Sequence, residues 1–183
     1  MKNFSITIHM VSSLDGMIAK EDNSISWFET TDRYAQGIDE EDYTGLMASI
    51  DCYVMGSHTY ELAVELSKNY GWAYGDKRTV VLTNRQLSSD RRNVEFYGGD
   101  LTGFVTEKLR TKYKNVWVVG GASLVKDFIR LKLADEIRIS ILPIILGDGL
   151  PFFNQISCEQ RLHLLESKAY KNGMVELRYE LVK

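Results

Sequence analysis

The sequence predicts an α/β domain with a mixed, mainly parallel central sheet that is flanked by helices and extended by antiparallel C-terminal strands. Up to Leu133, short apolar segments typical of strands alternate with segments of helical spacing. From Glu136 onward the segments are extended and are separated by turn signals at Gly147-Asp148-Gly149 and Asn172-Gly173. The 183 residues contain no linker and no repeat, so residues 1–183 are expected to form one domain.

The strands are predicted where apolar residues alternate with polar ones or form short continuous runs. Near the N-terminus, Phe4, Ile6 and Ile8 alternate with more polar residues. The apolar run before Gly120-Gly121 is continuous, as in a strand that is buried on both faces. The predicted strands span residues 4–11, 52–55, 79–83, 94–97, 116–119, 137–142, 162–167 and 175–182.

The helices are predicted from the spacing of apolar residues and from the composition of their first turns. Four carboxylates at residues 39–42 precede Leu46, Met47 and Ile50, and carboxylates are favoured at a helix N-terminus. Residues 122–133 carry apolar side chains at the spacing of a helix face that packs on a sheet. The predicted helices span residues 38–50, 59–66, 102–111 and 122–133, and the glycine- and aromatic-rich residues 69–77 are expected to form a loop.

Composition and charge exclude several classes of protein. The chain is 44% hydrophobic with only 2 prolines, which excludes a disordered or low-complexity protein. A net charge of −3 provides no positive field for a phosphate backbone, so we expect no nucleic-acid partner. The most apolar run is far below the roughly 20 residues that span a bilayer, and the N-terminus does not resemble a signal peptide. Two cysteines outside any CxxC pair indicate a reducing compartment, so we expect a cytoplasmic protein without a membrane partner.

Ligands of open α/β sheets bind where the strands end, so the loops after Val11, Met55, Thr83 and Val119 are the first candidates for a site. Gly120-Gly121 leads directly from a buried strand into a helix, whose first N–H groups and positive dipole end favour a phosphate. Two glycines would also serve a tight turn with close strand–helix packing. The full GxGxxG and Walker patterns are absent from the sequence.

Two further strand ends carry polar residues. Gly56-Ser57-His58-Thr59 offers a second strand-to-helix turn, and Thr83-Asn84-Arg85 adds amide, hydroxyl and guanidinium groups. Together the three strand ends could hold the phosphates of a dinucleotide, with Arg85 suited to bidentate pairing. The alternative is that Ser57 and Thr59 cap a helix and that Arg85 is a solvated surface charge.

The order and spacing of five segments make nearly the whole chain resemble the dihydrofolate-reductase-like family. Within it, the chain is most similar to stand-alone relatives of the reductase domain of riboflavin-biosynthesis deaminase-reductases. The segments are Ser13-Leu-Asp15-Gly16-Met-Ile-Ala19, Val54-Met-Gly56-Ser57-His58-Thr59-Tyr60-Glu61, Val80-Val-Leu-Thr83-Asn84-Arg85, Val118-Val-Gly120-Gly121-Ala-Ser123 and Pro143-Ile-Ile-Leu-Gly147-Asp148-Gly149.

The resemblance implies NADPH as cofactor, hydride transfer to a small, flat heterocycle of pteridine or pyrimidine type, and a homodimer. By matching positions, the implied cofactor contacts are Gly56, Ser57, His58, Thr59, Thr83, Asn84, Arg85, Gly120, Gly121, Ala122 and Ser123. Dihydrofolate reductases carry a basic residue where this chain has Ser57, which leaves Arg85 as the chief candidate for the 2′-phosphate. The zinc-deaminase signature is missing, which excludes a deaminase role.

The candidate catalytic residues are Glu40, which lies where the resemblance implies a carboxylate under the substrate, and Asp15, in the loop after the first strand. The acidic cluster around Glu40 could equally be a solvated helix start. Trp27 and Asp148 are the candidates for substrate contact, although a loop tryptophan is as readily part of a core. The three histidines lack metal-ligand spacing, so no metal is expected. The alternative function is a non-catalytic nucleotide-binding module of the same fold.

Overall fold

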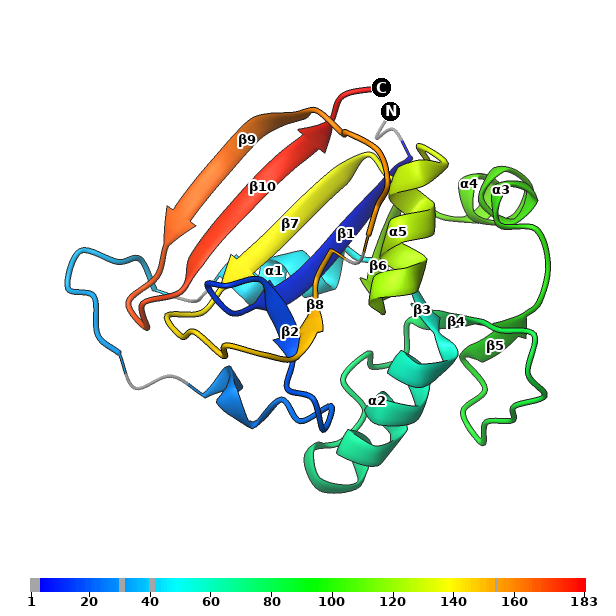
Figure 1. Ribbon diagram of the computed structural model, residues 1–183. Helices are drawn as coiled ribbons and strands as arrows, with labels where there is room; N and C mark the ends of the chain where they lie inside the picture. The colour runs from blue at the N-terminus through cyan, green and yellow to red at the C-terminus, as the bar shows by residue number, and fades with distance from the viewer. Residues whose placement is uncertain (1–3, 30–31, 40–41, 154) are drawn as a thin grey trace.

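The computed structural model describes residues 4–29, 32–39, 42–153 and 155–183 (Figure 1). Its central feature is an eight-stranded sheet in the order β5-β4-β3-β6-β1-β7-β10-β9. The strands of this sheet are β1 (Ser5–Ser12), β3 (Cys52–Gly56), β4 (Arg78–Leu82), β5 (Val94–Tyr97), β6 (Asn115–Gly120), β7 (Glu136–Ile141), β9 (Leu162–Ala169) and β10 (Val175–Leu181).

The sheet is parallel from β5 to β7 and antiparallel at its C-terminal end. β1 pairs in parallel with β6 and β7, and β3 pairs in parallel with β4 and β6. β10 is antiparallel to both β7 and β9. The predicted mixed α/β fold is therefore confirmed, including the change of strand direction after the last helix.

Helices cover the two faces of the sheet. They are α1 (Asp42–Ser49), α2 (Ser57–Tyr70), the continuous helical segment of α3 (Leu101–Gly103), η2 (Phe104–Leu109) and α4 (Arg110–Lys112), and α5 (Ala122–Arg130). α5 and η2 pack on the face that carries Ile6 and Ile8, whereas α1 and α2 pack on the opposite face around Tyr53 and Trp117. Among the described residues, no helix has the length and apolar composition needed to cross a membrane.

The predicted helices differ from the observed ones mainly at their ends. α2 begins at Ser57 and runs to Tyr70, beyond the predicted residues 59–66, because polar residues extend the helix once its apolar face is packed. α1 begins at Asp42, later than predicted. The sequence analysis missed the two-stranded sheet of β2 (Met17–Ala19) and β8 (Leu150–Pro151), and also the short helix η1 (Ser26–Phe28), because these elements are too short to show a periodic pattern.

The C-terminal strands leave one sheet face without a helix. Leu164 of β9 is paired with Tyr179 of β10, which is paired with the buried Ile137 of β7, so the three side chains share the face on which α5 packs farther along the sheet. In Figure 1 no helix lies over β9 and β10 on this side. Leu162, Leu164 and Val175 are 38–50% exposed there.

Candidate functional site

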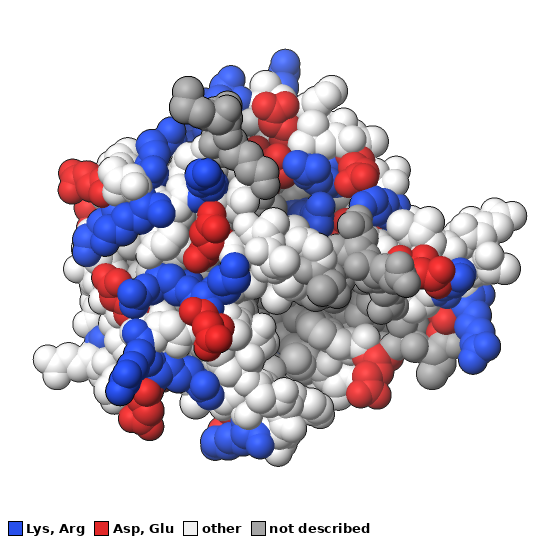
Figure 2. All heavy atoms as spheres, turned by 180° about the vertical axis from the view of Figure 1, so that it is seen from behind, with Lys and Arg blue, Asp and Glu red and all other residues white. Residues whose placement is uncertain are grey.

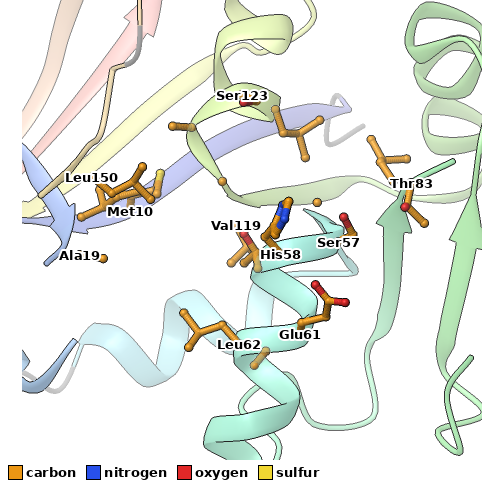
Figure 3. Close-up of a pocket in the computed structure, with 18 of the residues that line it drawn as sticks. Met10, Ala19, Ser57, His58, Glu61, Leu62, Thr83, Val119, Ser123 and Leu150 are labelled. Carbon is orange, nitrogen blue, oxygen red and sulfur yellow. The ribbon is translucent and has the colours of Figure 1, made fainter. Parts of the chain in front are cut away.

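A cleft of about 960 Å³ lies where β1, β3, β4 and β6 end, in the range of small-molecule sites. These strands are parallel, so their carboxyl ends meet at one edge of the sheet, as expected from the sequence. Figure 3 shows Met10, Ala19 and Leu150 grouped at one end of the cleft, and Ser57 and Thr83 toward the other. The cleft therefore has an apolar end and a polar end.

The β3–α2 turn supplies part of the polar end. Gly56 is the N-cap of α2, and among the described residues no side chain caps this helix. Ser57, His58 and Thr59 all line the cleft from the first turn of α2. The alternative in which Ser57 or Thr59 caps the helix is therefore wrong, and the first N–H groups of α2 remain available for a ligand.

The β6–α5 turn lies directly beside it. Gly121 is the N-cap of α5, again without a side-chain cap from the described residues, and Gly121, Ala122 and Ser123 line the cleft. A Cβ atom added to Gly56 would lie 3.8 Å from the Gly121 nitrogen, so the starts of α2 and α5 are close together. Two uncapped helix N-termini thus meet at one point of the cleft, which is the electrostatic arrangement that binds a phosphate group.

Gly120 has a different role from Gly121. It has φ +128°, in the region that favours glycine, and the Gly120–Gly121 peptide bond is cis. Gly120 is not among the residues that line the cleft, although the sequence placed it among the cofactor contacts. It shapes the turn, whereas Gly121 faces the ligand space.

The third polar edge is formed by the ends of β4 and β5. Thr83 and Asn84 line the cleft as predicted, and so do Tyr97, Gly98 and Gly99 after β5, which the sequence analysis did not single out. A Cβ atom on Gly98 would lie 2.8 Å from the Thr83 carbonyl oxygen, so only glycine fits this close approach. The sequence signal that could have identified Gly98 and Gly99 is a strand followed by two glycines, the same pattern as at residues 120–121.

Arg85 lies next to this edge but is not among the residues that line the cleft. Its guanidinium makes two hydrogen bonds to the carboxylate of Glu61, at 3.0 and 2.6 Å. Glu61 lines the cleft from α2 and was not predicted as a site residue. Arg85 is therefore an exposed surface charge, as one of the two sequence interpretations had it, but it is paired with Glu61 and is not a free cation.

Asp15 was predicted to lie beside the substrate, and the structure shows its carboxylate hydrogen-bonded within the loops. Its carboxylate accepts hydrogen bonds from the Ser13 hydroxyl at 2.6 Å and from the main-chain N–H groups of Leu146 at 3.1 Å and Gly147 at 2.8 Å. These bonds lower the pKa of Asp15 to about 2, led by the bond from Ser13. Asp15 does not line the cleft. Its carboxylate ties the loop after β1 to the loop after β7, and the lowered pKa favours its ionised form.

The two predicted substrate contacts also lie elsewhere. Trp27 is only 5% exposed and packs edge-on against Phe28, whereas Ile25 and Phe28 line the cleft in its place. Asp148 accepts a hydrogen bond from the neighbouring Gly149 N–H at 2.7 Å and does not line the cleft. Neither residue lines the cleft, because the local backbone conformation decides where each side chain points.

The predicted catalytic Glu40 and its neighbour Glu41 lie outside the described residues, so the role of Glu40 stays a prediction. Among the described residues, no group of three or more histidine, cysteine, aspartate or glutamate side chains could hold a metal ion.

The wall of the cleft contains a buried histidine that the sequence analysis did not select. His9 of β1 is 3% exposed, its Nε2 lies 3.0 Å from the Ser140 hydroxyl, and its ring stacks on Trp117, which also lines the cleft. Burial, and to a smaller extent the charge of Arg138, lowers the pKa of His9 to about 3. The imidazole is therefore neutral near pH 7. The sequence analysis did not select His9 because it lies within an apolar strand and has no motif around it.

The back of the molecule in Figure 2 carries Lys and Arg side chains interspersed with Asp and Glu. A surface of this kind does not form the continuous positive field that attracts nucleic acid. The protein has a slightly negative net charge, −3.

Comparison with known proteins agrees with this geometry. The sequence profile of the RibD C-terminal domain matches residues 5–176. The uncharacterized protein YwjB of Bacillus subtilis (strain 168) is 33% identical over 172 residues, which cover 94% of this chain and 95% of YwjB. The uncharacterized protein YyaP of the same organism is 25% identical over 190 residues, covering 98% of this chain and 96% of YyaP.

Solved structures show the same fold. A putative riboflavin biosynthesis protein from Shewanella sp. PV-4 superposes with a TM-score of 0.83 at 22% identity, covering 98% of this chain and all of that one (100%). The deaminase/reductase of Thermotoga maritima, a diaminohydroxyphosphoribosylaminopyrimidine deaminase/5-amino-6-(5-phosphoribosylamino)uracil reductase, has a TM-score of 0.68 at 16% identity, over 99% of this chain and 57% of its own.

Proposed function

The chain belongs to the RibD C-terminal domain family, and we propose that it is an NADPH-dependent reductase that transfers a hydride to a small heterocyclic substrate of pteridine or pyrimidine type. The observation that carries this proposal is the pair of uncapped helix N-termini that face one cleft at the carboxyl edge of the sheet. The described residues suit an anionic dinucleotide and include no candidate metal cluster.

The residues of the cleft fit the parts of NADPH. The N–H groups at the starts of α2 and α5 would hold the pyrophosphate, because Gly56 and Gly121 leave space for its close approach. Thr83 and Asn84 would contact the adenosine ribose. The apolar end, which includes Met10, Ala19 and Leu150, would receive the flat nicotinamide and substrate rings (Figure 3).

The cofactor supplies the hydride, so the protein has to position the two rings and exclude water from them. Ile18 and Ala19 are buried and line this end of the cleft, which limits the access of water. His9 is held neutral near pH 7 by its burial and can orient a polar group without donating a proton readily. The proton that the reduced substrate takes up would come from Glu40, as the sequence predicts, or from water.

One observation favours the alternative of a non-catalytic nucleotide-binding module. Asp15, one of the two carboxylates expected at the substrate, does not line the cleft, and its hydrogen bonds lower its pKa to about 2. A binding module would keep the phosphate site and lack a proton donor. The two functions differ in a single measurable property, the consumption of NADPH.

The test has two stages. NADPH is titrated into the protein with a chelator present, and quenching of tryptophan fluorescence is recorded, because Trp117 lines the cleft. Small carbonyl, imine and pterin compounds are then screened for loss of NADPH absorbance. Saturable quenching and turnover with one compound class support the reductase. Binding without turnover supports the module, and the absence of binding at millimolar NADPH, or binding only with a divalent ion, contradicts both.

A further inference from the structure

A bidentate ion pair joins α2 to the loop after β4 beside the polar end of the cleft. Nη1 of Arg85 lies 3.0 Å from Oε2 of Glu61, and Nη2 lies 2.6 Å from Oε1. The partners are 24 positions apart in the sequence, so the tertiary fold creates this contact. Figure 3 shows Glu61 on α2 one turn beyond Ser57 and on the side of Thr83.

The pair is fixed in position and charged. The main-chain N–H of Arg85 donates to the Thr83 hydroxyl at 3.0 Å, which anchors the loop at a residue that lines the cleft. The hydrogen bonds and the charge of Arg85 lower the pKa of Glu61, and Glu61 in turn raises the pKa of Arg85, so both groups are ionised near neutral pH. The side chains of Glu61 and Arg85 are 42% and 51% exposed, and Glu61 lines the cleft, so a ligand that extends past Glu61 could reach both groups.

A guanidinium uses the same two parallel N–H bonds for a carboxylate and for a phosphate. A 2′-phosphate on the adenosine ribose would have to displace the Glu61 carboxylate from Arg85 and would then lie beside its negative charge. A 2′-hydroxyl meets neither obstacle, because it can donate a hydrogen bond to a carboxylate that stays paired.

We infer that Glu61 is a specificity-determining residue of the nucleotide site, because its carboxylate competes with a 2′-phosphate for Arg85 and thereby narrows the preference for NADPH over NADH. This inference rests on the proposed function. Ser57 is in keeping with it, since this position offers a hydroxyl and no second cation to the phosphate.

The test measures nucleotide affinity without turnover. Adenosine 2′,5′-bisphosphate and 5′-AMP are titrated by calorimetry at low salt into the unmodified protein, Glu61→Gln, Arg85→Ala and the double variant. Glu65→Gln is the matched control, because Glu65 is one turn further along α2, pairs with Lys68 and does not line the cleft. Melting temperatures confirm that each variant is folded.

We expect Glu61→Gln to bind the bisphosphate about three- to tenfold more tightly than the unmodified protein, with little change for AMP, as suits a partly exposed charge pair. The gain should disappear in the double variant, because it acts through Arg85. An equal change for both nucleotides, no change, or a gain that persists without Arg85 overturns the role of Glu61 and leaves the proposed function intact. If neither nucleotide nor NADPH binds the unmodified protein, the proposed function and this inference both fail.

Discussion

The imidazole of His9 stacks on the indole of Trp117, with ring centroids 4.6 Å apart and an interplanar angle of 20°. The indole Nε1 also donates to the main-chain oxygen of His9 at 2.9 Å. The two residues belong to adjacent parallel strands and are 108 positions apart in the sequence. Both residues line the cleft, so the contact that joins the two strands also forms part of the wall of the proposed site.

The buried His9 predicts a specific loss of stability in acid. Its pKa is about 3 in the folded protein and about 6.5 when unfolded, so between these values the unfolded chain binds a proton that the folded one does not. Above pH 6.5 His9 is neutral in both states and its titration does not lower the stability. As the pH drops from 6.5 toward 3, the free energy of unfolding falls by up to about 1.4 kcal/mol per pH unit.

The measurement is urea unfolding at several pH values, compared with His9→Gln. The difference in free energy of unfolding between the two proteins should vary with pH below about 6.5 and be constant above it. Glutamine keeps a polar side chain next to Ser140 but does not titrate in this range. Parallel pH profiles for the two proteins would contradict the assigned titration.

Gly121→Val is expected to abolish NADPH binding while the domain still folds. Gly121 has φ −82°, a value that valine also adopts. Its Cβ would lie 3.4 Å from the Thr59 hydroxyl oxygen, and the two methyl groups would fill the space between the starts of α2 and α5. Fluorescence titration should show at least a hundredfold weaker binding, about 2.7 kcal/mol.

The control for this variant is Gly45→Val in α1, where a Cβ atom meets nothing within 4 Å. It should bind NADPH like the unmodified protein. Parental affinity in Gly121→Val would show that the β6–α5 turn does not hold a phosphate. Gly120 is unsuitable for the same test, because at φ +128° any other residue would strain the turn itself.

Asp15→Asn is expected to lower the melting temperature without changing the affinity for NADPH. The asparagine amide keeps one acceptor oxygen, but it lacks the negative charge and the second oxygen with which Asp15 accepts hydrogen bonds from Ser13, Leu146 and Gly147. Because the pKa of Asp15 in the folded protein is lowered to about 2, the ionised carboxylate stabilises the fold above the usual carboxyl pKa. This stabilisation is lost as the pH falls toward 2. Loss of turnover at an unchanged melting temperature would instead restore Asp15 as a catalytic candidate.

The expected homodimer is assigned to the uncovered face of β9 and β10. Paired residues on this face are uncharged and mostly apolar, with Ser167 as a polar member, and they include the exposed Leu162, Leu164 and Val175. A patch without charges can face its own copy across a two-fold axis without repulsion, and contiguous apolar patches mark interfaces. Leu164→Glu should convert a dimer to a monomer in light scattering, whereas His163→Gln on the opposite face of β9 should not. A monomeric unmodified protein would refute the assignment.

Glu40→Gln is expected to reduce kcat by about 10²- to 10⁴-fold on an identified substrate, which is the range for a general acid or a group that relays a proton. NADPH affinity should be unchanged, and Glu41→Gln, at the neighbouring carboxylate, is the control and should be almost silent. Steady-state kinetics and the NADPH titration separate the two effects. Turnover at the parental rate in Glu40→Gln would assign the proton to water or to another residue.

The sequence by itself determined the order of the main helices and strands, the mixed sheet and the three strand ends that supply polar residues to the cleft. Continuous apolar runs predicted β3 and β6, and the glycines that follow them predicted turns into α2 and α5. These signals are local, because periodicity and turn chemistry act over only a few neighbouring residues.

Only the tertiary structure decided which polar groups the cleft contains. Asp15 is tied to Gly147, which is 132 residues away, and Arg85 is paired with Glu61 of another element, and the local sequence indicates neither contact. His9 is neutral because neighbouring strands bury it. Hydrogen bonds and burial between distant segments depend on the sheet order β4-β3-β6-β1-β7, which short-range patterns do not specify.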